Sequence, residues 1–178
     1  MKSTQVYGEA KTILAPWCKA EGFKRIKSGM LGWQKQVADK FLTFWLQCSG
    51  DGWDFHAGSK FAVEFQLSGK SIIGDFGLGC SRKRLPYFLT ADDLNEVRQI
   101  QNDVIASLSR PPSDYFIYMM SPQAISWYLA KFDQVDQPYL QTEDIWLRYH
   151  QPEHVRRWAD FLLRLLPRIV AELSAKAN

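Results

Sequence analysis

A strict alternation of apolar and polar residues over positions 60–68 is the clearest pattern along the chain. This period of two is typical of a strand with one buried face. The apolar residues that the pattern places on one face are Phe61, Val63, Phe65 and Leu67. Residues 40–48 are more apolar still, and they predict a strand in the middle of a sheet.

Further short strands are expected around this pair. Residues 23–27 and 31–37 are separated by a Ser-Gly turn, and a Gly-Lys pair is expected to turn the chain into a strand near residues 71–76. Residues 80–89 are interpreted as a connector without regular structure. Residues 145–149 alternate weakly between apolar and polar and indicate a last short strand.

Four segments carry apolar residues at helical spacing. The first is expected to begin near Ser3 or Thr4, either of which can cap a helix, and to end at about Glu21, before Gly22. The others are expected from Thr90 to Arg110, from Ser121 to Phe132 and from Pro152 to Ala175. Hairpins followed by helices predict a single α+β domain over residues 1–178. It has an antiparallel sheet of four to six strands, an N-terminal helix and several C-terminal helices.

The two strongest strands are expected to pair with each other as a hairpin. Parity fixes their register, because only an odd sum of residue numbers places both apolar rows on one face. The pairs that this register brings together on the core face are Leu42 with Leu67, Phe44 with Phe65, and Leu46 with Val63. On the opposite face it sets Thr43, Trp45 and Gln47 beside Gln66, Glu64 and Ala62.

This second face combines a large aromatic ring with amide and carboxylate groups. We interpret Trp45, Gln47, Glu64 and Gln66 as candidate binding residues, because such a mixture suits a polar partner. The alternative interpretation is a second layer of helix that covers Trp45 while Glu64 reaches solvent.

The connection between the two strands, residues 49–60, is long for a hairpin loop and carries Trp53 and Phe55. Both are candidate binding residues, since aromatic side chains often dominate binding energy. The alternative is that both rings fold back onto the body of the protein, which would remove apolar surface from water.

Composition narrows the classes of partner and cofactor. The formal net charge of +3 on 178 residues is too small to indicate nucleic acid, although the first half of the chain is basic and the second acidic. A nucleic-acid partner is therefore an alternative without direct support. Three Cys residues without a C-x-x-C spacing predict neither disulfides nor a zinc ribbon. We expect no cofactor, no membrane partner and no signal peptide, and hence a cytoplasmic protein.

One string resembles a metal site. Residues 150–154 match H-x-x-E-H, in which both His residues must lie on one face of a helix. Pro152 disfavours helical backbone at Gln151, so His150 is expected in an extended segment and no zinc site is predicted. Neither a complete P-loop nor a G-x-S-x-G nucleophile elbow occurs, so no catalytic residue is assigned.

The first part of the chain resembles a known family. The motif reads Leu14-x-Pro16-x-x-Lys19-x-x-Gly22-Phe23-x-Arg25, and it continues with a strand containing Trp33, with Leu46-Gln47-Cys48-Ser49 and with the Phe61 strand. On these residues the N-terminal half is similar to the bacterial domain-of-unknown-function family 4304, although the loop before Phe61 is longer here. The resemblance implies a helix with an antiparallel sheet and brings no catalytic residues. By genomic analogy it points to immunity proteins and other partners of toxins.

Taken together, these observations lead us to expect a non-catalytic module that binds another protein. An immunity-type inhibitor of a bacterial toxin is one such role. The alternative is a small enzyme or a nucleic-acid-processing protein that uses the polar face around Glu64 with nearby Arg25.

Overall fold

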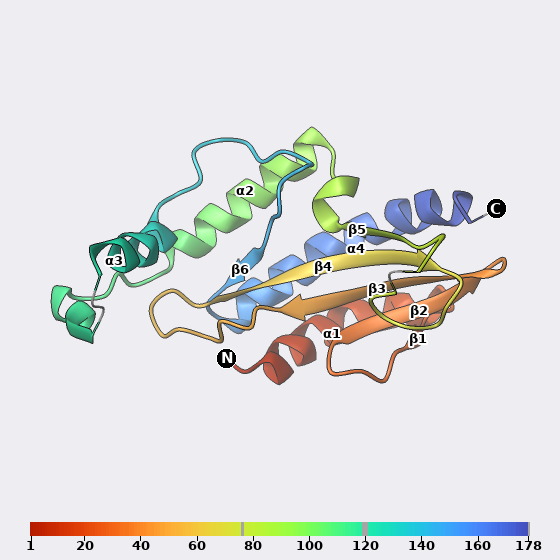
Figure 1. Ribbon diagram of the computed structural model, residues 1–178, viewed down its shortest axis with the longest axis horizontal. Coiled ribbons are helices and arrows are strands. Elements are labelled where there is room, and N and C mark those ends of the chain that lie inside the picture. Colours follow the sequence, from red (N-terminus) through yellow and green to blue (C-terminus); the bar gives the residue numbers. More distant parts are fainter. Residues whose placement is uncertain (76, 119–120, 178) are drawn as a thin grey trace.

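The computed structural model describes residues 1–75, 77–118 and 121–177 and has the α+β fold predicted from the sequence (Figure 1). Helix α1 (Ser3–Ala20) precedes a six-stranded antiparallel sheet. Helices α2 (Ala91–Ala106) and α3 (Pro122–Leu129) lie between the fifth and sixth strands in the chain, and α4 (Pro152–Ala175) follows the sixth.

The sheet is built around its two longest strands. The order is β1-β2-β3-β4-β5, and β6 also pairs with β4. The strand bounds are β1 Lys24–Arg25, β2 Leu31–Val37, β3 Lys40–Cys48, β4 Ser59–Ser68, β5 Ser81–Arg84 and β6 Leu147–Tyr149. Because β3 occupies one edge of β4, the short strands β5 and β6 share its other edge.

The predicted register of β3 and β4 is confirmed. Leu42 pairs with Leu67, Phe44 with Phe65, and Leu46 with Val63. On the opposite face, Thr43, Trp45 and Gln47 pair with Gln66, Glu64 and Ala62. The alternation of side chains therefore separates a purely apolar face from a mixed polar and aromatic one, as the parity argument requires.

Aromatic rings run across the apolar face from strand to strand. Phe44 stacks on Trp33 of β2 at 5.2 Å and on Phe65 of β4 at 5.9 Å between ring centroids, and Phe88 meets Phe65 edge-on at 5.1 Å. Helices α1 and α4 pack against each other on this side of the sheet (Figure 1). The core therefore lies between this aromatic row and the two helices.

Two expectations about strands are wrong. Residues 71–74 form bends and turns instead of a strand, and the fifth strand is Ser81–Arg84, within the segment interpreted as a connector. This strand contains no apolar residue, because it borders β4 at the edge and turns Arg82 and Arg84 toward the polar face. Hydrophobic alternation cannot reveal such a strand.

The helix ends also differ in detail. Lys2, not Ser3 or Thr4, is the N-cap of α1, and the Gln5 side chain accepts a 2.8 Å hydrogen bond from the Lys2 backbone N–H. Helix α2 ends at Ala106 instead of running to Arg110. No helix in the described part of the chain is long and apolar enough to cross a membrane.

Gly58, at the end of the β3–β4 loop, provides a test of the close approach between this loop and β6. Its φ is +68°, and an added Cβ would lie 2.2 Å from the backbone oxygen of Tyr149. We expect Gly58→Ala to lower the free energy of unfolding by about 3 kcal/mol. Alanine disfavours the positive φ at this position, and its Cβ would clash with the backbone oxygen of Tyr149. Gly52→Ala, with φ +78° but open space around it, should cost about 1 kcal/mol.

Gly50→Ala is the matched control, since its Cβ would meet nothing within 4 Å and its φ is not positive. Urea unfolding of the three variants should reproduce this order. Equal stability of the Gly58 and Gly50 variants would contradict the close approach of the loop to β6.

Candidate functional site

The polar face of β3 and β4 is covered by residues 69–75 and 77–80, which belong to the segment between β4 and β5. Figure 1 shows this segment crossing in front of β2 and β3. Trp45 and Glu64 are only 1% and 2% exposed, and Gln66 is fully buried, whereas Gln47 keeps partial exposure. The structure differs from the alternative interpretation of this face in both respects: a loop covers Trp45 instead of a helix layer, and Glu64 does not reach solvent.

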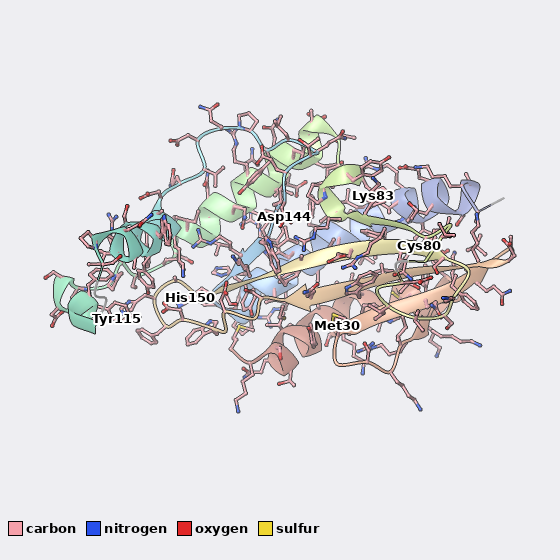
Figure 2. All side chains as sticks on the ribbon, in the orientation of Figure 1. Met30, Cys80, Lys83, Tyr115, Asp144 and His150 are labelled. Atoms are coloured by element: carbon pink, nitrogen blue, oxygen red, sulfur yellow. The ribbon has the colours of Figure 1, made fainter. Side chains whose placement is uncertain are left out.

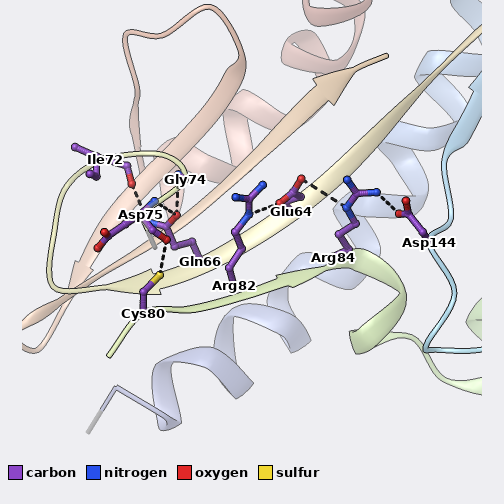
Figure 3. A network of polar contacts seen from close by, with 9 residues as sticks. All are labelled: Glu64, Gln66, Ile72, Gly74, Asp75, Cys80, Arg82, Arg84 and Asp144. Atoms are coloured by element: carbon purple, nitrogen blue, oxygen red, sulfur yellow. Dashed lines mark hydrogen bonds and ion pairs between the residues drawn. The ribbon is translucent and has the colours of Figure 1, made fainter. Parts of the chain in front are cut away.

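Gln66 holds this covering segment through both ends of its side-chain amide (Figure 3). Its Oε1 accepts hydrogen bonds from the backbone N–H groups of Gly74 at 2.9 Å and Asp75 at 3.1 Å. Its Nε2 donates to the backbone oxygen of Ile72 at 2.7 Å. The Ser68 hydroxyl donates to the Asp75 carboxylate at 2.5 Å. A buried amide that satisfies three backbone groups fixes one conformation of the loop.

Glu64 is a buried carboxylate flanked by two arginines (Figure 3). Arg82 Nε lies 2.5 Å from its Oε2, and Arg84 Nε lies 3.6 Å from its Oε1. Arg84 also pairs with Asp144, and the Arg82 guanidinium lies 5.2 Å from the Trp45 ring centroid. Because both carboxylate oxygens face guanidinium groups, the charge of Glu64 is compensated within the fold.

The β3–β4 loop is organised by Asp54. The carboxylate Oδ1 accepts hydrogen bonds from the backbone N–H of His56 at 2.8 Å and of Ala57 at 2.6 Å, and from the Tyr128 hydroxyl at 2.7 Å. Oδ2 accepts one from the Tyr115 hydroxyl at 3.1 Å. One side chain therefore closes the loop and ties it to two other elements: α3, and the short 3₁₀ helix η2 (Ser113–Tyr118).

These hydrogen bonds set the ionisation of Asp54. Partial burial alone would raise the pKa of this carboxyl, but the bonds from Ala57, Tyr128, His56 and Tyr115 together outweigh it and hold the pKa below its ordinary value. The fold consequently favours the charged form.

The two candidate aromatic residues of the loop behave differently. Trp53 partly folds back: its ring stacks on that of His150 at 5.6 Å, its Nε1 donates to the His150 backbone oxygen at 3.3 Å, and 37% of its surface stays exposed. Phe55 is 71% exposed. Its backbone oxygen lies 2.7 Å from the His150 Nε2, so the backbone at Phe55 is held while its ring stays exposed.

The H-x-x-E-H string caps a helix. Gln151 has extended backbone, with φ −125° and ψ 162°, as Pro152 predicts. The His154 Nδ1 accepts hydrogen bonds from the backbone N–H groups of His150 at 3.1 Å and Gln151 at 3.3 Å. Burial, followed by the neighbouring His150, lowers the pKa of His154, which suits this acceptor role. No group of three or more metal-ligating side chains occurs among the described residues, and the absence of zinc stays a prediction.

Four aromatic side chains form a continuous surface around the β3–β4 loop, which we call the aromatic surface: Trp53, Phe55, His56 and Tyr115. Successive ring centroids lie 6.3, 5.2 and 4.9 Å apart. Figure 2 shows Tyr115 and His150 toward one end of the molecule, with Cys80 and Lys83 toward the other.

Sequence reasoning predicted helix α3 from its Ser121 cap but missed Tyr115 and the part that α3 takes in supporting this surface. In α3, Trp127 is exposed and only Tyr128 is buried. The signal available in the sequence was the density of aromatic residues between positions 115 and 132, which exceeds what one short helix can bury.

A pocket of about 250 Å³ opens beside this surface. Its lining comes from the β3–β4 loop, from Lys131 after α3, and from the segment around β6. The charged and aromatic side chains that line it are Asp51, Asp54, Lys60, Lys131, Trp146 and Arg148. None of the last three was singled out from the sequence.

Removing the Asp54 carboxylate should loosen the whole aromatic surface. We expect Asp54→Ala to lower the free energy of unfolding by about 2 to 4 kcal/mol, because four donors lose a charged acceptor. Asp51→Ala on the same loop is the control and should leave the free energy of unfolding close to that of the parent, since the Asp51 side chain is 76% exposed. Urea unfolding of both variants measures the contrast, and equal losses would refute the role of Asp54.

The lowered pKa of Asp54 predicts a pH dependence of stability. A carboxyl whose pKa is lowered in the folded state stabilises the fold fully at a pH above its unfolded-state pKa of about 3.9. This stabilisation is lost as the pH falls through the lower pKa of the folded state. The difference in unfolding free energy between the parent and Asp54→Asn should be constant from about pH 7 to 5 and shrink below about pH 4. A difference that grows at acidic pH would contradict the sign.

The chain matches no protein-family model, no curated protein and no solved structure. The similarity of the N-terminal motif to family 4304 therefore stays a prediction from the sequence.

Proposed function

We propose that this protein is a non-catalytic module that binds another protein through the aromatic surface. The observation that carries the proposal is the exposure of Phe55, with the partly exposed Trp53 beside it, on a loop whose backbone is held by Asp54 and His150. Protein interfaces are enriched in such rings, which bury much area with few rotatable bonds.

Fixation of the loop supports the proposal on energetic grounds. Binding costs free energy for every segment that must become ordered. Here Asp54 and His150 already hold the backbone around Phe55, through hydrogen bonds of 2.6 to 2.8 Å at Ala57, His56 and the Phe55 oxygen. A partner that contacts these rings therefore meets a surface ordered in advance.

The other four candidate residues take different parts in this proposal. Trp45, Glu64 and Gln66 are buried, so we assign them an indirect role: Gln66 holds residues 72–75, and Glu64 holds Arg82 and Arg84 of β5. Gln47, which is partly exposed on β3 near the loop, stays a candidate for direct contact.

The alternative of catalysis at Glu64 is disfavoured by the same geometry. A general base must reach a substrate proton, whereas Glu64 is 2% exposed and pairs with Arg82 and Arg84. Its contacts resemble those of a structural ion pair.

A cytoplasmic immunity-type inhibitor of a bacterial toxin fits this mode of action, because such a protein acts by covering its target and needs no chemistry of its own. This part of the proposal rests on the sequence resemblance. Capture of partners from the native bacterial host, followed by mass spectrometry, tests whether a toxin is among them.

Once a partner is isolated, Trp53→Ala and Phe55→Ala are each expected to weaken its binding by about 30-fold or more, equivalent to about 2 kcal/mol for an aromatic anchor. Leu78→Ala is the matched control, because Leu78 is a fully exposed apolar residue on the segment 69–80, outside the aromatic surface. Calorimetry on variants with parent-like circular dichroism measures the affinities. Parent-like binding by both aromatic variants would refute the proposed surface.

A further inference from the structure

We propose that the pocket beside the aromatic surface receives the carboxylate of an Asp or Glu side chain of the partner protein. This inference rests on the proposed function and adds the chemistry of the partner: an acidic side chain seated next to the contacts made by Trp53 and Phe55.

Arg148 is the central observation. It lies on β6 and lines the pocket, and burial lowers the pKa of its guanidinium, with Tyr139 acting in the opposite direction. In the described part of the chain its side chain makes one hydrogen bond, from Nη2 to the backbone oxygen of Lys131 at 2.5 Å. Within the described residues, no carboxylate forms an ion pair with it.

A partly buried guanidinium without a carboxylate is unusual, because removing a charge from water is costly unless an opposite charge compensates it. The planar group also presents its donors in a fork that matches a carboxylate. The remaining donors of Arg148 therefore suit an oxyanion in the pocket.

The charges around Arg148 favour one particular class of anion. Lys60, Lys131 and Arg148 are cationic and Asp51 and Asp54 are anionic, so the lining carries one positive charge in excess. The four donors described above already engage Asp54, and Asp51 lies 3.6 Å from Lys60. A single excess charge matches a monoanionic carboxylate better than a phosphate with nearly two negative charges.

Asp51 is an exposed member of the pocket lining. Its side chain is exposed, and a hydrogen bond from Ser49, followed by the charges of Lys60 and Lys131, lowers its pKa. The Asp51 charge is therefore compensated by lysine, whereas Arg148 has no carboxylate partner within the described residues.

Trp146 supplies an apolar wall that positions the cations. The Lys60 Nζ lies 5.4 Å from the Trp146 ring centroid, and the Arg84 guanidinium lies 5.1 Å from it. The indole Nε1 donates to Asp144 at 3.2 Å, so the ring is held by Asp144. A low-polarity wall beside fixed cations strengthens their attraction for an incoming carboxylate.

The pocket is continuous with the aromatic surface. Gly52 and Asp54 both line the pocket, and Trp53 stands between them in the chain. A partner that covers Trp53 and Phe55 is therefore positioned to insert a short acidic side chain beside them. Such a pairing of an aromatic anchor with a desolvated charge is typical of strong interfaces.

The first arm of the test uses the protein alone with free anions. Sodium acetate is titrated to about 100 mM at constant ionic strength, because so small a ligand binds weakly. The assigned NMR signals of the Trp146 indole N–H and the Arg148 Nε–H report occupancy. We expect saturable shifts with acetate, and an apparent affinity that falls about 10-fold in Lys131→Gln and is lost in Arg148→Gln.

Lys27→Gln is the matched control, since Lys27 is an exposed cation on the β1–β2 connection and does not line the pocket. It should bind acetate like the parent. Arg148→Gln removes the hydrogen bond to the Lys131 backbone oxygen and can therefore lower stability. The Lys131 side chain is exposed, so Lys131→Gln tests the pocket without this loss. Absence of a saturable shift with acetate, or inorganic phosphate binding 10-fold more tightly than acetate, would overturn the proposal.

The second arm uses the isolated partner. Its affinity should fall about 10-fold or more in both Arg148→Gln and Lys131→Gln, and acetate should compete with it. If acetate binds the pocket but both variants bind the partner like the parent, the pocket serves a free small carboxylate and the inference is wrong. If the proposed function itself is wrong, the result differs: Trp53→Ala and Phe55→Ala then bind the partner like the parent. The acetate titration still shows in that case whether the pocket binds a carboxylate.

Discussion

The pairing of β3 with β4 is the interaction on which the remainder of the structure depends. Its register places Phe44 opposite Phe65 and Trp45 opposite Glu64, so one face of this strand pair is apolar and the other is mixed. The apolar face determines where α1 and α4 pack, because a continuous row of aromatic rings must be removed from water. The mixed face sets a different requirement: whatever covers it must also supply partners for its polar groups.

That requirement explains why a loop covers the mixed face. A helix satisfies its own backbone groups and offers few of them to a neighbour, whereas an irregular segment presents free N–H and C=O groups. Gln66 uses three such groups from residues 72–75, and Glu64 is met by two arginines from the edge strand. The arrangement is not fully satisfied, since Trp45 Nε1 is buried without a hydrogen-bond partner in the described part of the chain. Burial of these polar groups thus favours a unique conformation more than it favours stability.

Local patterns predicted most of this fold and only part of the candidate site. Periodicity and parity placed the strands up to β4, the register of the central hairpin and the starts of α3 and α4, because those elements are set by their own apolar residues. They failed at β5, whose residues Ser81 to Arg84 are polar and are held by Glu64 across the sheet. The loop was recognised from Trp53 and Phe55, but its support was not. Asp54 gains its role from Tyr115 and Tyr128, more than 60 residues away, and no local pattern encodes a contact of that kind.

The shared edge of β4 has a topological consequence. The chain leaves this edge at Arg84, passes through α2, η2 and α3, and returns as β6 to the same edge, where Arg84 pairs with Asp144. Residues 85–143 thus form a long, closed excursion from the sheet, that is, a connection between β5 and β6 whose two ends are joined by the ion pair of Arg84 with Asp144. Lengthening such a closed excursion costs little entropy, since the penalty grows only with the logarithm of its length. Its tip carries Tyr115 and Trp127, so evolution can remodel the part of the molecule that faces outward while the strand order beneath it stays the same.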